Sequence, residues 1–216
     1  MSAAVDDPTR AGDEPLPAGW PEDVEFLTEL WWAAGIPAEV RARYEGGGTS
    51  GVGFPDDIDI MQVDAAGHAA VNERVRICEI TDERHPSHGQ RGLYAAHALA
   101  AHTHVLDYRG VVQSDDGAAV AESDYSVHMH GALSVDAAAA GNEARFINDF
   151  RGVAGRPNVA LDTYRDAADG RVRVGVFTLN AAVAAGEELL VTYGRAFWRA
   201  RGVQSSEPDW DPAWDD

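Results

Sequence analysis

Lysine is absent from this chain of 216 residues, so its 17 basic residues are all arginines and no side chain offers an amine. Acidic residues number 36, which gives a formal net charge of -19 at neutral pH. A surface this negative repels phosphate backbones, so we expect no direct contact with nucleic acid. The charge is consistent with a cationic partner, and equally with acidity that serves only solubility.

Cysteine occurs once, as Cys78, and long apolar runs do not occur. One thiol excludes an internal disulfide framework and any zinc cluster that needs three or four thiolates of this chain. It also favours a reducing, intracellular compartment. Residues 1–20 lack the hydrophobic stretch of a secretory signal, and no segment is long and apolar enough to span a bilayer, so we expect no membrane partner.

The composition along the chain predicts a main domain between acidic ends. Residues 1–20 are rich in aspartate, proline, glycine and alanine, which is typical of a disordered acidic tail. Residues 21–70 are expected to form a helical N-terminal extension followed by a glycine-rich connection. We expect the main domain at 71–200 and an acidic C-terminal tail at 201–216.

A helical pattern opens the N-terminal extension. Pro21 suits a first helical position, acidic residues follow it, and apolar residues then recur at spacings of three and four. The pattern predicts an amphipathic helix that ends near Gly35, with Trp31 and Trp32 packed in the core rather than exposed for a ligand. A second short helix is expected over residues 37–43.

From residue 71 onward, alternating apolar and polar residues predict a mainly β domain. In one of these strands the side chains of Val172, Val174 and Val176 should point inward. The side chains of Arg171 and Arg173, which alternate with them, should point into water. The expected strands span residues 71–77, 93–95, 104–112, 124–130, 158–164, 171–179 and 188–192.

Histidines occur in closely spaced pairs, His102 with His104 and His128 with His130. On a strand, this spacing puts both rings of a pair on one face, where they could chelate zinc. No third ligand is identifiable by spacing, so we expect no metal. The sequence motifs of serine hydrolases, P-loop kinases, zinc proteases and dinucleotide-binding dehydrogenases are absent.

Four segments carry motifs whose order along the chain is informative. They are GQRGLYAAHALAAHTHVLDYRGVV at 89–112, SDYSVHMHGALSVDA at 123–137, GNEARFINDFRGVAGRPN at 141–158 and GEELLVTYGRAFW at 186–198. Together they resemble the SET domain family of protein lysine methyltransferases, whose pattern runs GxGLxA, YxG, RFINHSCxPN and GEELxxxYG. One motif alone is weak, but several in the right order provide the context that a motif needs.

The resemblance implies a SET-type β-clip fold, in which small curved sheets surround a knot-like, threaded C-terminal segment. It implies S-adenosylmethionine as the cofactor on one face and a narrow lysine channel on the other. Carried over by position, Tyr193 matches the catalytic tyrosine, and Tyr108 would line the lysine channel. The resemblance implies that Asn148 and the backbones of Arg91, Gly92, Leu93 and Asp149 hold the cofactor, with Tyr125 and Arg145 nearby. Trp198, or alternatively Phe197, would stack on the adenine.

The chemistry explains why tyrosines are needed there. Methyl transfer from a sulfonium requires a neutral amine, whereas free lysine has a pKa of about 10.4. Aromatic walls disfavour the charged amine by desolvation and align its nitrogen with the methyl group. Burial of Tyr108 and Tyr193 for packing alone is the alternative. Val191 stands two residues before Tyr193, where family members often have an aromatic, and this favours transfer of more than one methyl group.

The sequence departs from the family pattern at identifiable positions. Asp149 stands where the family has histidine, and Gln90 replaces the first glycine of GxG. Eight residues, rather than the family's four, separate Asn148 from Pro157. The turn beneath the cofactor must therefore be built differently.

The zinc-binding cysteine clusters that flank many histone methyltransferases are also missing. We expect residues 21–44 to brace one side of the site in their place. Trp210 or Trp214 of the acidic tail should cover the other side.

Three functions are compatible with these observations. The first is an active lysine methyltransferase acting on a basic protein or peptide, a histone tail before a nonhistone protein, located in the nucleus rather than in the cytoplasm. The second, motivated by Asp149 and Gln90, is a SET-like peptide-binding module without transfer activity. The third is an acidic histone-interaction protein, which explains the charge but not the motifs. The oligomeric state stays open.

Overall fold

The computed structural model describes residues 5–6, 16–46, 61–63, 71–115 and 123–203. Most of the predicted N-terminal tail and of the glycine-rich connection lies outside these residues, as does the C-terminal tail from residue 204 onward with both of its tryptophans. The expectation that a tryptophan of that tail covers the site therefore stays a prediction.

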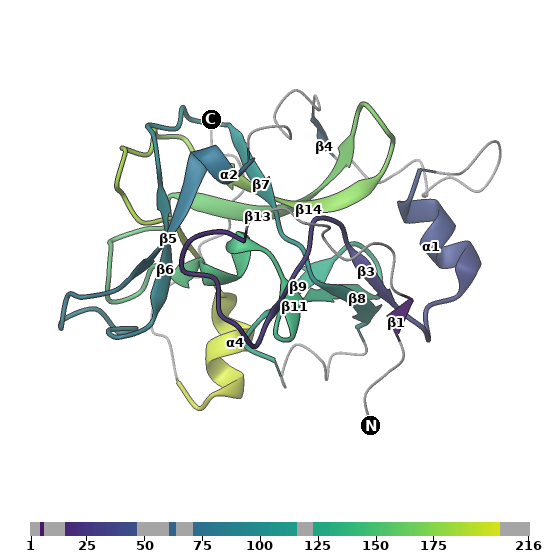
Figure 1. Cartoon of the computed structure of the whole chain (residues 1–216), viewed down its shortest axis with the longest axis horizontal. Helices are drawn as coiled ribbons and strands as arrows, with labels where there is room; N and C mark the ends of the chain where they lie inside the picture. Colours follow the sequence, from purple (N-terminus) through teal and green to yellow (C-terminus); the bar gives the residue numbers. More distant parts are fainter. Residues whose placement is uncertain (1–4, 7–15, 47–60, 64–70, 116–122, 204–216) are drawn as a thin grey trace.

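Short strands are the main kind of secondary structure in the described chain, and they confirm the predicted mainly β fold of small sheets (Figure 1). The strands are β1 Val5–Asp6, β2 Glu25–Phe26, β3 Trp31–Ala33, β4 Met61–Val63, β5 Val75–Glu79, β6 Arg91–Ala95, β7 His104–Asp107, β8 Val111–Ser114, β9 Ser126–Met129, β10 Leu133–Asp136, β11 Ala140–Gly141, β12 Asn148–Asp149, β13 Val159–Asp166, β14 Val172–Thr178 and β15 Leu190–Val191. The helices are α1 Ala38–Tyr44, α2 Val71–Arg74, the 3-10 helix η2 Glu143–Phe146 and α4 Gly194–Ala200.

Two sheets contain most of these strands. One has the order β1-β3-β8-β10-β9, and in the other the hairpin of β13 and β14 is flanked by β4 and β7. The pairs β5-β6, β2-β11 and β12-β15 complete the pattern. Figure 1 shows the β13–β14 hairpin crossing the middle of the molecule, with β5 and β6 on one side and β3 and β8 on the other. Buried apolar side chains of both large sheets join in one core.

The predicted helix over residues 21–34 is wrong, because strand pairing takes up this segment. Trp31 and Trp32 lie in β3, which runs parallel to β8 with Trp31 opposite Val111. The side chain of Trp32 is buried as expected. The second predicted helix is confirmed: α1 begins directly after Pro37. Helical spacing of apolar residues is a local signal, and a parallel partner about eighty residues away overrides it.

Two predicted strands have different bounds for local reasons. Residues 71–74 form the short helix α2, so the first strand of the domain begins at Val75. The strand expected over 104–112 is divided between β7 and β8. Gly110 lies in the break, where an added Cβ would be 2.4 Å from the carbonyl oxygen of Asp136. Only glycine allows the two backbones to come this close.

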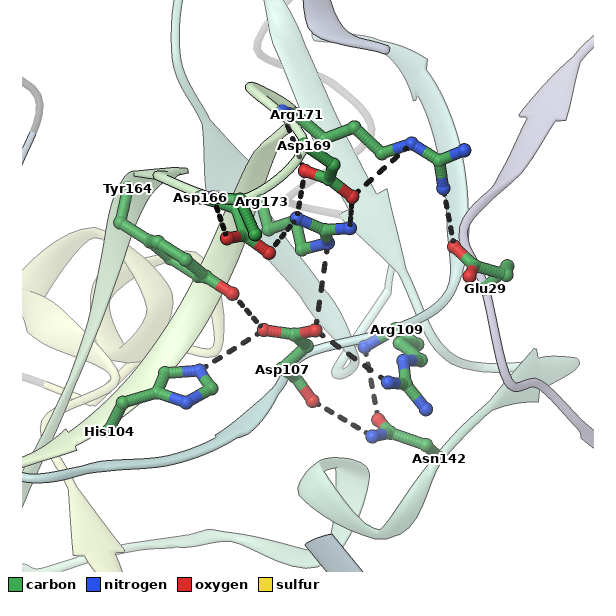
Figure 2. A network of polar contacts seen from close by, with 11 residues as sticks. Glu29, His104, Asp107, Arg109, Asn142, Tyr164, Asp166, Asp169, Arg171 and Arg173 are labelled. Carbon is green, nitrogen blue, oxygen red and sulfur yellow. Dashed lines mark hydrogen bonds and ion pairs between the residues drawn. The ribbon is translucent and has the colours of Figure 1, made fainter. Parts of the chain in front are cut away.

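The inward valines of β14 are confirmed, because Val172, Val174 and Val176 are all buried. The prediction that Arg173 points into water is wrong. Its Nη1 lies 2.8 Å from Asp166 Oδ2, and its Nη2 lies 2.6 Å from Asp169 Oδ2. The guanidinium is thus only 14% exposed and faces a group of carboxylates (Figure 2). Charge pairing overrides the alternation of the strand at this position.

Asp107 is the buried centre of this network (Figure 2). Its Oδ1 accepts a hydrogen bond from the Tyr164 hydroxyl at 2.7 Å and lies 3.1 Å from His104 Nε2. Its Oδ2 lies 3.6 Å from Arg109 Nη2 and 3.8 Å from Arg173 Nε. Burial alone would raise the pKa of Asp107, but the hydrogen bonds and the nearby arginine lower it to about 2. The carboxylate therefore stays charged and ties β7 to β13 and β14.

The chain crosses itself at β12 and β15. These strands pair in parallel, with Asn148 opposite Leu190. On the other edge of β15, the backbone N–H of Asn158 donates to the Leu190 carbonyl at 3.0 Å, and the Leu190 N–H donates to Asn158 Oδ1 at 2.8 Å. The C-terminal segment thus lies between the two ends of the loop 148–158, as a knot-like crossing requires.

Candidate active site

Two cavities open beside this crossing and share part of their walls. The larger has a volume of about 700 Å³ and the smaller of about 380 Å³. The residues that line both are Asp124, Tyr125, Arg145, Tyr193 and Phe197. A side chain that lines both cavities stands between them, so the two cavities adjoin at these residues.

The larger cavity brings together most of the residues expected to bind the cofactor. Those that line it are Arg91, Tyr125, Arg145, Asn148 and Trp198, together with Phe197. Gly92, Leu93 and Asp149 are not among its lining residues. Leu93 is fully buried in the core, and its carbonyl accepts a hydrogen bond from the Leu189 N–H at 2.7 Å. Its side chain therefore belongs to the core, and its backbone joins β6 to the segment before β15.

Asp149, the residue that replaces the family histidine, is a buried hydrogen-bond acceptor for the C-terminal segment. Its Oδ2 accepts the backbone N–H of Tyr193 at 2.7 Å and the indole N–H of Trp198 at 3.2 Å. Arg151 Nη1 lies 2.9 Å from the same oxygen. The carboxylate is 7% exposed. It thereby fixes the start of α4, from which two aromatic rings reach the larger cavity.

Tyr193 and Tyr108 present hydroxyls with the same bonding pattern. The Tyr193 hydroxyl donates to the Ile147 carbonyl at 2.8 Å, and the Tyr108 hydroxyl donates to the Tyr125 carbonyl at 2.8 Å. Burial raises the pKa of both tyrosines, and the charge of Asp149 adds to this at Tyr193. Both hydroxyls stay protonated at neutral pH, and each donates its hydrogen bond to a backbone carbonyl. Their oxygens remain available as hydrogen-bond acceptors.

Arg145 forms a flat part of the wall between the cavities. Its guanidinium carbon lies 4.2 Å from the ring centre of Tyr125 and 5.0 Å from that of Phe146. Its Nε donates to the Ala137 carbonyl at 2.9 Å. Such stacking places the cation against ring faces, where it is stabilised by the π-system. The arginine is thus held in place by the protein itself.

Asn148 is held by a second buried carboxylate, Glu188, which the sequence analysis did not single out. Asn148 Nδ2 donates to Glu188 Oε1 at 2.9 Å. The other oxygen of Glu188 lies 3.2 Å from His85 Nε2 and accepts the Tyr94 hydroxyl at 3.3 Å. A Cβ added to Gly92 would lie 2.6 Å from Glu188 Oε1. Gly92 therefore serves the site by leaving room for this carboxylate.

Burial raises the pKa of Tyr94 to about 12, and the charge of Glu188 adds to the shift. The phenol therefore acts as a hydrogen-bond donor to Glu188 across the physiological range. The position of Glu188 inside the GEEL motif was a signal that could have identified it. No comparable sequence signal marks His85.

The N-terminal extension supplies a further part of the wall. Pro21, Asp23 and Val24 line the larger cavity. The indole N–H of Trp20 donates to the Val24 carbonyl at 2.7 Å, and the Trp20 ring packs edge-on against Phe146 at 5.7 Å. The extension was predicted to brace the site as a helix. It lies at the cavity as an irregular segment instead.

Asp124 and Arg201 form an ion pair at the rim that the sequence did not predict. Arg201 Nε donates to Asp124 Oδ1 at 2.7 Å, and its Nη2 contacts the same oxygen. The arginine carbon also lies 3.6 Å from the ring centre of Phe197. Asp124 remains 66% exposed, so the pair is open to solvent.

The histidine pairs do not converge on a common point. The ring of His104 faces Asp107, and that of His128 lies 3.2 Å from Asp115. Within the described parts of the chain, no group of three or more histidine, cysteine or acidic side chains could hold a metal ion. Among these residues there is also no helix that is long and apolar enough to cross a membrane.

The two cavities adjoin at Tyr125 and Tyr193, so the site has room for two molecules side by side. The family model of the SET domain matches residues 90–194, and this region of the chain is a SET domain. The matched region contains the residues that line both cavities, apart from Phe197. SET domains are generally protein lysine methyltransferases. A search of curated proteins found no match to the chain.

Proposed function

We propose that the protein is an S-adenosylmethionine-dependent protein-lysine N-methyltransferase that acts on a basic protein tail such as a histone tail. One observation carries the proposal: Tyr193 and Tyr125 line both the larger and the smaller cavity. A methyl donor in the first and an amine in the second would meet at these tyrosines. The acidic chain, with its net charge of -19, supports a cationic substrate.

The residues of the larger cavity fit the cofactor in size and chemistry. Its volume of about 700 Å³ lies within the usual range for small-molecule sites. Arg91 offers donors to a carboxylate, and Asp23 and Glu79 offer acceptors to an ammonium group or to ribose hydroxyls. The ring of Trp198 offers an apolar face to the adenine.

When bound, S-adenosylmethionine supplies a methyl group activated by a sulfonium. The chain's own residues orient the acceptor amine. Tyr193 and Tyr108 are protonated, and their hydroxyl hydrogens are bonded to backbone carbonyls. Their oxygens can therefore accept hydrogen bonds from the nitrogen of the substrate without attacking the methyl group. Aromatic walls disfavour the charged amine, which favours loss of its proton to water.

The replacement of the family histidine by Asp149 is compatible with an active enzyme. Asp149 binds the backbone of Tyr193 directly, so the tyrosine is anchored in spite of the change. This supports transfer activity over a peptide-binding module that has lost it. With a histone substrate, we propose a nuclear rather than a cytoplasmic location.

Calorimetry with S-adenosylmethionine tests the proposal. The full chain should bind the cofactor, and Asn148→Ala should weaken binding about tenfold, because Asn148 lines the cavity and loses its bond to Glu188. Glu39→Gln on the exposed face of α1 is the control and should bind like the parent protein. An absence of binding to the parent protein would contradict the proposed function.

A further inference from the structure

The charged side chains that line the smaller cavity differ in whether other groups of the protein already bind them. The charged or titratable side chains among its lining residues, apart from the tyrosines, are Asp124, His128, Arg145 and Asp162. Arg201 pairs with Asp124, and Asp115 lies 3.2 Å from His128. Arg145 is bonded to a backbone carbonyl and stacked on Tyr125. Three of these four groups are thus already engaged by the protein.

Asp162 differs from the other three. It lies on β13 opposite Gly175 and is partly buried. Its Oδ1 accepts one hydrogen bond, from the backbone N–H of Thr163 at 2.8 Å. Within the described residues, no arginine or histidine forms an ion pair with this carboxylate. Its second oxygen is therefore open to a cation that enters the cavity.

Burial raises the pKa of Asp162, and the hydrogen bond from Thr163 offsets this only in part. Partial burial removes water from a carboxylate, so its charged form is destabilised when no cation lies nearby. A positive ligand beside it would restore that stability. An amine that arrives as an ammonium ion brings such a charge, whereas an apolar side chain of the same length does not.

We propose that Asp162 is the residue that recognises the positive charge of the incoming lysine side chain in the smaller cavity. The identification of that side chain as lysine rests on the proposed function. Asp162 then acts as a specificity residue: it favours an ammonium-bearing chain over a neutral one before the nitrogen loses its proton. Asp124 is less suited to this task, because it is 66% exposed and already paired with Arg201.

Two small probes separate charge recognition from shape. n-Butylammonium reproduces the end of a lysine side chain, and butan-1-ol has a similar length without the charge. Ligand-observed NMR titrations of both probes into the full chain would compare the parent protein with Asp162→Asn. The control is Glu39→Gln, which removes the same charge from the exposed face of α1.

Asp162→Asn should weaken n-butylammonium binding about fivefold or more and should change butan-1-ol binding by less than about twofold. Glu39→Gln should leave both affinities at the parent value. Equal n-butylammonium affinity of the parent and Asp162→Asn would overturn the inference, as would an equal loss for both probes or no n-butylammonium binding to the parent protein. The NMR titrations contain no methyl donor, so they test the role of Asp162 independently of the cofactor. A failure of cofactor binding in calorimetry would contradict the proposed function and would leave the result of the titrations unchanged.

Discussion

Asp107 and Asp149 are both buried carboxylates with several donors, yet they act on different parts of the molecule. Asp107 is 3% exposed and joins side chains of neighbouring strands in the β13–β14 sheet (Figure 2). Asp149 is 7% exposed and binds groups of the C-terminal segment at the crossing. The first carboxylate holds a sheet together, and the second positions residues that line the larger cavity.

The two carboxylates differ in which groups would lose a partner if the negative charge were removed. Without the charge of Asp107, Arg173 and Arg109 would lose a buried counter-charge that no solvent can replace. Without the charge of Asp149, the backbone of Tyr193 and the indole of Trp198 would lose an acceptor next to an open cavity. The first loss should act on folding, and the second on the placement of the reacting groups.

The largest expected effect is on stability. Asp107→Asn should lower the free energy of unfolding by about 3 kcal/mol, because it breaks a buried, charge-paired network. Urea denaturation followed by fluorescence measures this. Glu39→Gln, at an exposed position of α1, is the control and should change the value by less than about 0.5 kcal/mol. A loss below about 1 kcal/mol in Asp107→Asn would mean that the network contributes little to the fold.

The second prediction concerns acid. The pKa of Asp107 in the folded protein is about 2, below its ordinary value of 3.8, so the carboxylate stabilises the fold above the ordinary value. This contribution, roughly 2 kcal/mol, should disappear as the pH falls from about 4 to about 2. Between these limits, the parent protein should lose more stability than Asp107→Asn does. Parallel pH profiles of the two proteins would refute the assignment.

Asp149→Asn should act on activity more than on folding. The amide would turn an N–H toward one of the donors that the carboxylate now accepts, so Tyr193 or Trp198 would shift. Turnover in methyl transfer should fall about tenfold to a hundredfold, since small misplacements of reacting groups cost this much. The loss of unfolding free energy should be smaller than in Asp107→Asn. A variant that is destabilised as strongly but keeps full turnover would reverse the comparison.

The smallest effect is expected at the exposed pair of Arg201 and Asp124. Removing it with Arg201→Ala should change the unfolding free energy by about 1 kcal/mol or less, because solvent screens the charges. Thermal denaturation of Arg201→Ala and of Asp107→Asn, each compared with the parent protein, measures the difference between the two losses of stability. A loss as large as that of Asp107→Asn would show that exposure does not separate the two kinds of pair.

The sequence predicted the β-rich fold and several residues that line the two cavities, because motifs and alternation are local features. Tyr193, Tyr108 and Asn148 stand in recognisable motifs, and each lies at a cavity or in its wall. The inward face of β14 followed directly from the alternation of valines. These features need no knowledge of distant partners.

The features that were missed depend on contacts between distant segments. The segment with Trp31 has helical spacing, but pairing with β8 makes it a strand. Arg173 alternates like an exposed residue, but its guanidinium lies beside the buried Asp107, which comes much earlier in the chain. The partners of Asp149 lie 44 and 49 residues further along the chain. No local pattern could reveal these contacts.

The most direct measurement of the central claim is methyl transfer from labelled S-adenosylmethionine to a lysine-containing protein extract, with Tyr193→Phe beside the parent protein. The parent protein should label basic proteins. The variant lacks the hydroxyl that bonds to Ile147 between the two cavities, and it should label them at least about tenfold less. Because the chain contains no lysine, any lysine-bound label must belong to a substrate protein. Equal labelling by the variant, or none by the parent protein, would contradict the assignment of Tyr193 as the residue at which methyl donor and amine meet.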